Sequence, residues 1–179
     1  MTYLRNFFIA MTIGCLFLCG VPKIALAEDT SPQINPATVQ TVQMHSHQLA
    51  GALMQKNSLD SKAIVGVLTK YLKKNPHVYG ASFTLAPIAK NGGLIKFAPY
   101  VYRNGKKFTA INLAQSYDYT RQDWYAVPVN LKKPVWSKPY FDQGGGNAWM
   151  VTYSIPVYSD KEQTKLAGVV TNDVLITKK

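Results

Sequence analysis

The side chains best suited to binding chemistry gather in one irregular stretch of the sequence, residues 114–147. Charged groups are interleaved there with aromatic rings that follow no strand-like alternation. An aromatic wall with a few charged groups is the usual composition of a small-ligand site, although a single ring in a connector often only caps a core. The cluster as a whole therefore predicts a pocket. Its members are Tyr117, Asp118, Tyr119, Arg121, Asp123, Trp124, Tyr125, Trp136, Tyr140, Phe141 and Asp142.

Arg121 and the later Asp173 each have a defined binding chemistry. A guanidinium can hold a carboxylate through two parallel hydrogen bonds. Asp173 lies in the otherwise apolar segment 166–176, where a buried aspartate can accept hydrogen bonds from an ammonium group. The alternative for Asp173 is a satisfied aspartate at a turn or a strand edge. Both interpretations are retained at this point.

No catalytic residue, cofactor or metal is predicted. Both cysteines, Cys15 and Cys19, fall in an N-terminal segment expected to be removed, which excludes a disulfide framework, a cysteine-ligated metal and a cysteine nucleophile. His45 and His47 stand two residues apart on a predicted helix, so they point to different faces and chelate a metal poorly. The triple glycine 144–146 lacks the residues of a phosphate-binding loop.

A small hydrolase is the least favoured alternative. Asp118 and Asp123 are the acids that could form a general acid and base pair. Nothing in the sequence fixes the separation of their carboxyl groups, and there is no Gly-x-Ser-x-Gly nucleophile motif. Replacing either aspartate by asparagine would abolish turnover if this alternative held.

Residues 1–27 have the pattern of a secretion signal. Arg5 precedes an apolar run, and Ala25-Leu26-Ala27 matches the small-x-small cleavage pattern. The run is short for a membrane span, and an uncleaved N-terminal anchor is the alternative. The sequence therefore predicts a periplasmic or secreted protein, cleaved near Ala27, with residues 28–35 as a polar tether.

Composition narrows the function classes further. The chain has 179 residues, a formal charge of +11 and 47% hydrophobic residues, which argues against disorder. Removing residues 1–27, which contain Arg5 and Lys23 and no acid, lowers the charge to +9 and leaves enough sequence for one domain. Such a charge suits nucleic acid, but export argues against that partner. An envelope protein that binds anionic lipid or polysaccharide is retained as the second function class.

The hydropathy pattern predicts two helices followed by strands. An N-cap residue and a proline start a helix over about 36–56, and Asp60 or Ser61 starts a second helix that Asn75-Pro76 ends. Asn104-Gly105 is a hairpin signal. An α+β fold with a mostly antiparallel sheet follows from this order. The expected strands are 78–85, 94–102, 107–113, 148–158 and 166–176.

The first predicted helix carries an a/d-like apolar stripe formed by Val39, Val42, Leu49 and Leu53. Such a stripe can join two copies of the chain side by side, or it can pack on the chain's own sheet. A homodimer through helix 36–56 and intramolecular packing are therefore both retained.

Five ordered motifs resemble those of a Cache domain, the PAS-like extracytoplasmic sensor domain of bacterial chemoreceptors, histidine kinases, cyclases and phosphatases. The resemblance covers about residues 36–177, so residues 36–179 are expected to form a single Cache sensor domain. It implies a long N-terminal helix packed on a central antiparallel sheet, and ligand sensing without catalysis. The motifs are DWY (123–125), KPVWSKPY (133–140), GGGN (144–147), TYSIPV (152–157) and GVVTNDV (168–174).

The resemblance also implies roles for single residues. In the amino-acid-binding members, an arginine two residues before a Trp-Tyr pair helps to hold the ligand carboxylate, and a downstream tyrosine and a late aspartate help to hold the amino group. The Trp-Tyr pair is residues 124–125 here, but Gln122 stands where the arginine is expected and Arg121 is one residue earlier, about 100° around a helix. The predicted ligand-binding residues are Arg121, Trp124, Tyr125, Tyr140, Asp142, Tyr153 and Asp173.

The sequence thus predicts an exported sensor domain that captures a small molecule such as an amino acid or a carboxylate. It is expected to act in signal transduction through a separate membrane-bound partner. Many relatives join two Cache modules in one chain, whereas this sequence has room for one.

Overall fold

The computed structural model describes residues 34–56 and 59–177 of the chain. The predicted signal segment, residues 1–27, and most of the predicted tether lie outside these ranges. Within them, no helix combines the length and the hydropathy that crossing a bilayer requires.

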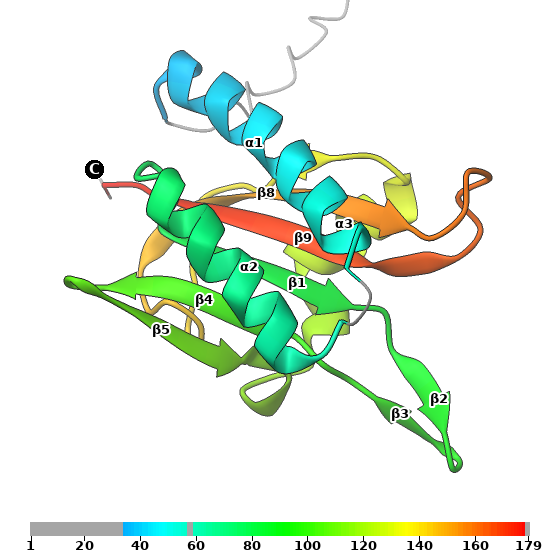
Figure 1. The fold of residues 1–179 in the computed structure, drawn as a ribbon. Coiled ribbons are helices and arrows are strands. Elements are labelled where there is room, and N and C mark those ends of the chain that lie inside the picture. Colours follow the sequence, from blue (N-terminus) through cyan, green and yellow to red (C-terminus); the bar gives the residue numbers. More distant parts are fainter. Residues whose placement is uncertain (1–33, 57–58, 178–179) are drawn as a thin grey trace, which may run out of the picture.

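Two helices form one layer of the domain. α1 (Pro36–Met54) begins where the sequence predicts, with the Asn35 side chain accepting a hydrogen bond from a first-turn backbone amide at 2.8 Å. α2 (Ser61–Lys74) is capped by the Asp60 carboxylate, which accepts from another first-turn amide at 2.8 Å. Both helices lie across the same face of the sheet (Figure 1).

An antiparallel sheet forms the centre of the domain. Its strands, together with a separate hairpin of β2 and β3, are β1 (Gly80–Leu85), β2 (Ile88–Lys90), β3 (Gly93–Ile95), β4 (Pro99–Asn104), β5 (Lys107–Asn112), β6 (Val135–Trp136), β7 (Tyr140–Phe141), β8 (Trp149–Tyr158) and β9 (Leu166–Leu175). The spatial order is β5-β4-β1-β9-β8-β6, and β7 also pairs with β8. The predicted α+β class with a mostly antiparallel sheet is confirmed.

The prediction of one strand over residues 94–102 is wrong. Residues 93–95 pair back with β2 through an Asn91-Gly92 turn, in which both residues have positive φ angles of 51° and 75°. This is the geometry that Asn-Gly favours in a type I′ hairpin. β4 starts separately at Pro99, and the β2–β3 hairpin projects from the body of the domain (Figure 1).

The face of the sheet beneath α1 and α2 carries an aliphatic core. The stripe predicted on the first helix packs here, and Val42, Leu49 and Leu53 are buried against the chain's own sheet. Intramolecular packing therefore describes this stripe, and a homodimer through helix 36–56 stays a prediction. The core also contains Ile64, Leu68, Leu72, Phe83, Val101, Val151, Ile155 and Val170.

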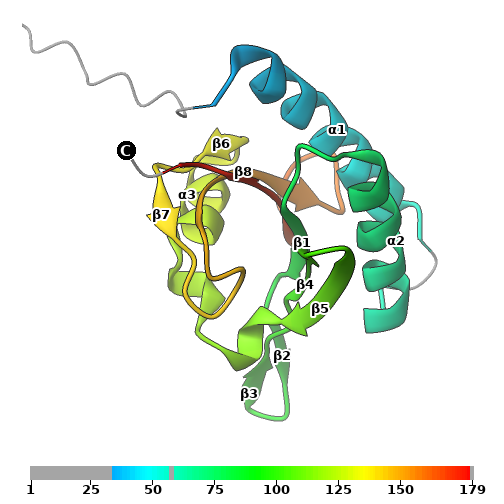
Figure 2. The ribbon, with the colours of Figure 1, turned by 90° about the vertical axis from the view of Figure 1, so that its left-hand side faces the viewer.

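The opposite face is covered by the connector between β5 and β8 (Figure 2). It contains two short 3₁₀ turns, η1 (Leu113–Gln115) and η2 (Tyr119–Arg121), and then α3 (Asp123–Leu131). The Tyr119 hydroxyl donates a hydrogen bond to the Leu85 carbonyl oxygen at 2.8 Å and so fastens the connector to the end of β1. The second core lies here and is mainly aromatic: Ala98, Tyr100, Leu113, Tyr119, Trp124, Tyr125 and Val169.

Candidate functional site

A small chamber lies between the connector and the centre of the sheet. Its volume is about 10 Å³, which is no more than one water molecule occupies. Four of the predicted ligand-binding side chains meet here: Trp124, Tyr140, Asp142 and Asp173. The complete lining is Tyr100, Leu113, Tyr117, Trp124, Tyr140, Asp142, Thr152, Thr171 and Asp173.

A chain of hydrogen bonds crosses the chamber. The Thr152 hydroxyl donates to the Asp173 carboxylate at 2.8 Å, and its oxygen lies 2.8 Å from the Tyr140 hydroxyl. Because a hydroxyl has one proton to give, the Tyr140 hydroxyl is then the donor to Thr152. Tyr140 on β7, Thr152 on β8 and Asp173 on β9 thus form one connected unit.

Asp142 reaches the chamber from the glycine-rich turn after β7. Its carboxylate accepts from the Gly146 amide at 3.1 Å and from the Tyr117 hydroxyl at 3.4 Å. A Cβ atom added at Gly145 would overlap this carboxylate, so the close approach of the turn requires glycine. The triple glycine therefore positions a carboxylate, as the sequence alone did not indicate.

The two chamber carboxylates are both hard to ionise. Burial, and after it the nearby charge of Asp142, raise the pKa of Asp173 to about 7, while the hydrogen bond from Thr152 opposes the shift. Burial also raises the pKa of Asp142 against the hydrogen bonds from Gly146 and Tyr117. No lysine, arginine or histidine is among the residues that line the chamber. The site is therefore electronegative and lacks a positive group of its own.

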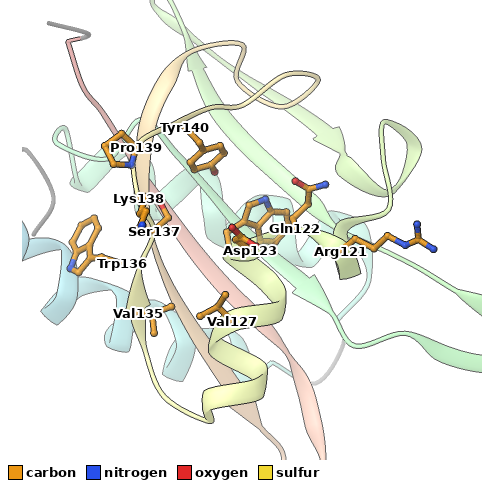
Figure 3. Close-up of a pocket in the computed structure, with 11 residues that line it drawn as sticks. Arg121, Gln122, Asp123, Val127, Val135, Trp136, Ser137, Lys138, Pro139 and Tyr140 are labelled. Atoms are coloured by element: carbon orange, nitrogen blue, oxygen red, sulfur yellow. The ribbon is translucent and has the colours of Figure 1, made fainter. Parts of the chain in front are cut away.

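Two wider pockets adjoin the chamber. One, of about 580 Å³, lies between α3 and the segment around β6, and the other, of about 490 Å³, lies beside the glycine-rich turn. Tyr140 and Gln122 line both of them, and Tyr140 also lines the chamber. Figure 3 shows Tyr140 and Gln122 at the larger pocket. Displacement of the Tyr140 ring would therefore connect the chamber with both outer pockets.

Arg121 stands at the rim of the larger pocket but does not turn into it. Its side chain is 85% exposed, and its Nε lies 3.8 Å from the Asp118 carboxylate. In Figure 3 the guanidinium points away from Tyr140. Gln122, the residue before α3, lies between the two outer pockets. A neutral amide therefore occupies the position from which a guanidinium could reach a ligand carboxylate.

Besides Arg121, the structure places two more predicted site residues, Tyr125 and Tyr153, outside the chamber. The Tyr125 ring packs edge-on against Tyr119 in the aromatic core, with 5.1 Å between the ring centroids. Tyr153 belongs to the core on the other face of the sheet, where it packs on Trp136. The alternation of side chains along β8 explains this difference, because Thr152 faces the chamber and its neighbour must face the helices.

Thr152, Thr171 and Tyr100 line the chamber without having been predicted as site residues. A strand-alternation argument could have found the two threonines, since each lies an even number of residues from Asp173 or directly opposite it in the β8–β9 register. Nothing local distinguishes Tyr100, because its approach depends on the pairing of β4 with β1.

In the alternative hydrolase pair, Asp118 is unsuited to act as the general acid because its pKa is lowered. A hydrogen bond from Lys96, 2.6 Å away, and one from Thr120 lower the pKa of Asp118 to about 2. A general acid needs the opposite shift. Among the described residues there is also no group of three or more histidine, cysteine or acidic side chains placed to hold a metal ion.

Comparison with known proteins identifies the family. Residues 64–178 match the family described as methyl-accepting chemotaxis protein-like, first PDC sensor domain. Comparison with curated proteins gives no significant match.

Solved structures agree with this assignment. The extracellular domain of soHK1S-Z6, named as a histidine kinase, is 29% identical, with a TM-score of 0.68 over 76% of this chain and 53% of that chain. The ligand-binding domain of the Pseudomonas aeruginosa PAO1 amino acid chemoreceptor PctC, solved with GABA, shares the fold at 17% identity and a TM-score of 0.55, over 78% of this chain and 57% of that one. The chain thus spans about half the length of these structures.

These findings confirm the predicted PAS-like sensor fold, and the soHK1S-Z6 match is itself an extracellular domain. Cleavage near Ala27 lies outside the described residues and stays a prediction. The chain belongs to the family of methyl-accepting chemotaxis protein-like PDC sensor domains.

Proposed function

We propose that this chain is a sensory module that captures a small cationic amine in the chamber beneath Tyr140 and acts through a membrane-bound signalling partner. One observation carries the choice of ligand: two buried carboxylates, Asp142 and Asp173, face a chamber whose lining has no cation. Membership of a chemoreceptor-type sensor family supports the sensory role.

An ammonium group would complete the electrostatics of the chamber. A buried carboxylate without a counter-charge is costly, which is why burial raises the pKa of Asp173 to about 7. An ammonium group donates up to three hydrogen bonds and offsets the charge of both carboxylates. The rings of Tyr117, Trp124 and Tyr140 also line the chamber, and aromatic faces attract cations.

A ligand carboxylate has no equivalent partner here. Two cations line the larger outer pocket, Arg121 and Lys138, and both are exposed to solvent, with Arg121 turned toward Asp118. Gln122 is neutral. Of the ligand classes expected from the sequence, the structure therefore favours the amino group as the recognised part. A carboxylate on the same ligand would contribute little to affinity, because a solvent-screened guanidinium contributes little.

Binding requires the chamber to open. A volume of about 10 Å³ excludes any organic amine, so the Tyr140 ring must leave its position beside Thr152. That movement would involve β7, which pairs with β8 through Tyr140 and Met150. Strands β8 and β9 carry side chains of both the chamber and the core beneath α1 and α2.

The test is calorimetric titration of the full chain with butylamine, GABA and butyrate at pH 8, which is above the pKa of about 7 of Asp173. These probes share a four-carbon chain and carry an ammonium group only, both groups and a carboxylate only. We expect saturable binding of butylamine, binding of GABA no tighter than that of butylamine, and no binding of butyrate. Binding of butyrate alone would contradict the proposal.

Two variants make the test specific. Asp173→Asn removes one chamber charge while keeping its shape, and it should weaken butylamine binding by about tenfold to a hundredfold, as expected for a lost charge-assisted hydrogen bond. Gln122→Arg adds a guanidinium between the two outer pockets, and it should raise the affinity for GABA over butylamine by about tenfold. If Asp173→Asn binds butylamine as well as the parent chain does, the chamber is not the amine site.

A further inference from the structure

A second concave surface lies on the opposite side of the molecule, between α1 and α2. This α1–α2 groove has a volume of about 560 Å³. It shares no residue with the chamber or with the two pockets around Tyr140. Its chemistry is therefore independent of the ligand site.

The groove is shaped by two facing helical stripes. On α1 the lining residues recur every three or four positions, from His45 through Leu49 and Ala52, and on α2 they recur in the same way from Val67 to Tyr71. Residues at this spacing lie on one side of a helix. The apolar members of the two stripes, Leu49, Ala52, Val67 and Tyr71, give the groove an apolar floor between the helices, which is the shape that a third helix fills.

The rim of the groove is basic. Lys56, Lys70 and Lys74 are exposed and line it, and no acidic residue does. The two ion pairs found among the described residues, Lys96–Asp118 and Arg121–Asp118, do not involve these three lysines. The groove thus presents positive charges around an apolar floor.

The lysines are not required at the end of α2 for helix capping. The Arg103 guanidinium on β4 already donates to the carbonyl oxygens of Leu72, Asn75 and Val78, the last two at 3.1 and 2.9 Å. This partly buried contact engages the Leu72 carbonyl oxygen in the last turn of α2 without either lysine, and the side chains of Lys70 and Lys74 are exposed and available to a partner.

We propose that the α1–α2 groove docks an acidic amphipathic helix of a partner protein. Charge complementarity selects an acidic partner, and the apolar floor selects one with an apolar stripe. A second copy of this chain would bring the same three lysines against each other, and a bilayer surface cannot enter a concave groove of this kind. The helical layer is suited to this role because residues 36–77 contain five lysines and a single acid, Asp60, at the start of α2.

The test uses two labelled peptides of about 18 residues, or five helical turns, with the same composition of Leu, Glu and Ala. One places the leucines in a helical stripe with glutamates on both flanks, and the other is scrambled. Fluorescence anisotropy with the full chain should show the striped peptide binding about tenfold more tightly than the scrambled one. Vesicles of anionic phospholipid form a third arm, and we expect them to compete poorly for the striped peptide.

Separate variants then change the charge of the groove and block its floor. Lys70→Glu/Lys74→Glu should weaken the striped peptide by about tenfold, while Lys90→Glu/Lys133→Glu, which changes the net charge equally at exposed sites away from the helical layer, should change binding by less than about twofold. Ala52→Trp fills the floor at an exposed position and should also weaken binding. Equal binding of both peptides, equal effects of both double variants, or displacement of the peptide by vesicles would overturn the proposal.

Discussion

The two faces of the central sheet are built from the same strands but carry different kinds of side chain. Beneath α1 and α2 the side chains are mostly aliphatic, and Val151, Val170 and Leu68 are fully buried without any charge to satisfy. On the other face, the same strands present Thr152, Asp173 and their hydroxyl-bearing neighbours beneath aromatic rings. One face is packed with apolar side chains, and the other buries two carboxylates with no counter-charge among the residues that line the chamber.

This contrast indicates which face of the sheet responds to pH and to a bound ligand. An aliphatic face stabilises the fold in proportion to the apolar area it buries, and it is indifferent to pH. Burying two carboxylates on the other face costs free energy when they are ionised. Binding of a proton or of an ammonium group lowers that cost. Five substitutions test this difference between the two faces, in order of decreasing expected effect.

Leu68→Ala tests the helix-covered face. Leu68 is 0% exposed, so the substitution should lower the free energy of unfolding by about 2–5 kcal/mol through lost burial and a residual cavity. Urea unfolding measures the loss, and Leu131→Ala on an exposed leucine is the control, expected to change it by less than about 0.5 kcal/mol. Amine affinity of the folded Leu68 variant should be unchanged, and a loss there would mean that the faces are not independent.

Asp173→Asn tests the charged face through pH. The pKa of Asp173 is about 7 when folded and 3.8 in its ordinary state, so the folded protein holds the proton more tightly across that interval. The free energy of unfolding should therefore fall as pH rises from about 4 to 7 and level off above, by up to about 4 kcal/mol in total. Denaturant titrations across this range should show the fall in the parent chain and in Glu162→Gln, and a much shallower one in Asp173→Asn.

Gly145→Ala tests the turn that brings Asp142 to the chamber. The new Cβ would meet the Asp142 carboxylate, and the resulting shift should cost about 1–3 kcal/mol and weaken amine binding. Gly51→Ala is the matched control, because a Cβ at that position on α1 meets nothing within 4 Å. Loss of one helical glycine there should stabilise the fold by up to about 1 kcal/mol. Thermal unfolding distinguishes these opposite signs.

Tyr140→Phe removes the hydroxyl that joins β7 to Thr152. One neutral hydrogen bond is lost while the ring remains, so stability should fall by only about 1 kcal/mol. If opening of the chamber limits binding, the association rate for butylamine should rise, as stopped-flow measurements can show. An unchanged rate would indicate that Tyr140 is not the barrier.

Arg121→Ala should have the smallest effect. With its side chain 85% exposed, Arg121 should alter stability by less than about 0.5 kcal/mol. Calorimetry should find butylamine affinity changed by less than about twofold. A loss of tenfold or more would show that the guanidinium reaches the ligand, which would contradict the amine proposal.

The sequence predicted the helices and the long strands well, because their signals are local. The capping residue Asp60 and the proline after Asn35 set helix starts whatever the rest of the chain does. It was wrong about residues 94–102, where an Asn91-Gly92 turn redirects the chain into a separate hairpin. The apolar residues on both sides of Lys96 gave that stretch the pattern of a single strand.

The candidate site was predicted in part. Trp124, Tyr140, Asp142 and Asp173 come together in the chamber, whereas Tyr153 points to the opposite face. An aromatic residue in a strand suits either face of a sheet. The pairing of Asp173 with Thr152, rather than with Tyr153, decides that Tyr153 faces away from the chamber. Their role in binding a ligand stays a prediction.

The sequence by itself determined which residue types were available: aromatic rings, carboxylates and a flexible glycine turn in one connector, and an apolar stripe on each helix. Only the tertiary structure decided which of them meet. Long-range strand pairing places Asp173 beside Thr152 and leaves Arg121 in solvent, and the packing of α1 beside α2 surrounds an apolar groove with lysines. Local signals fix an element, but whether a side chain is charged and which groups it contacts depend on burial, which the whole fold sets.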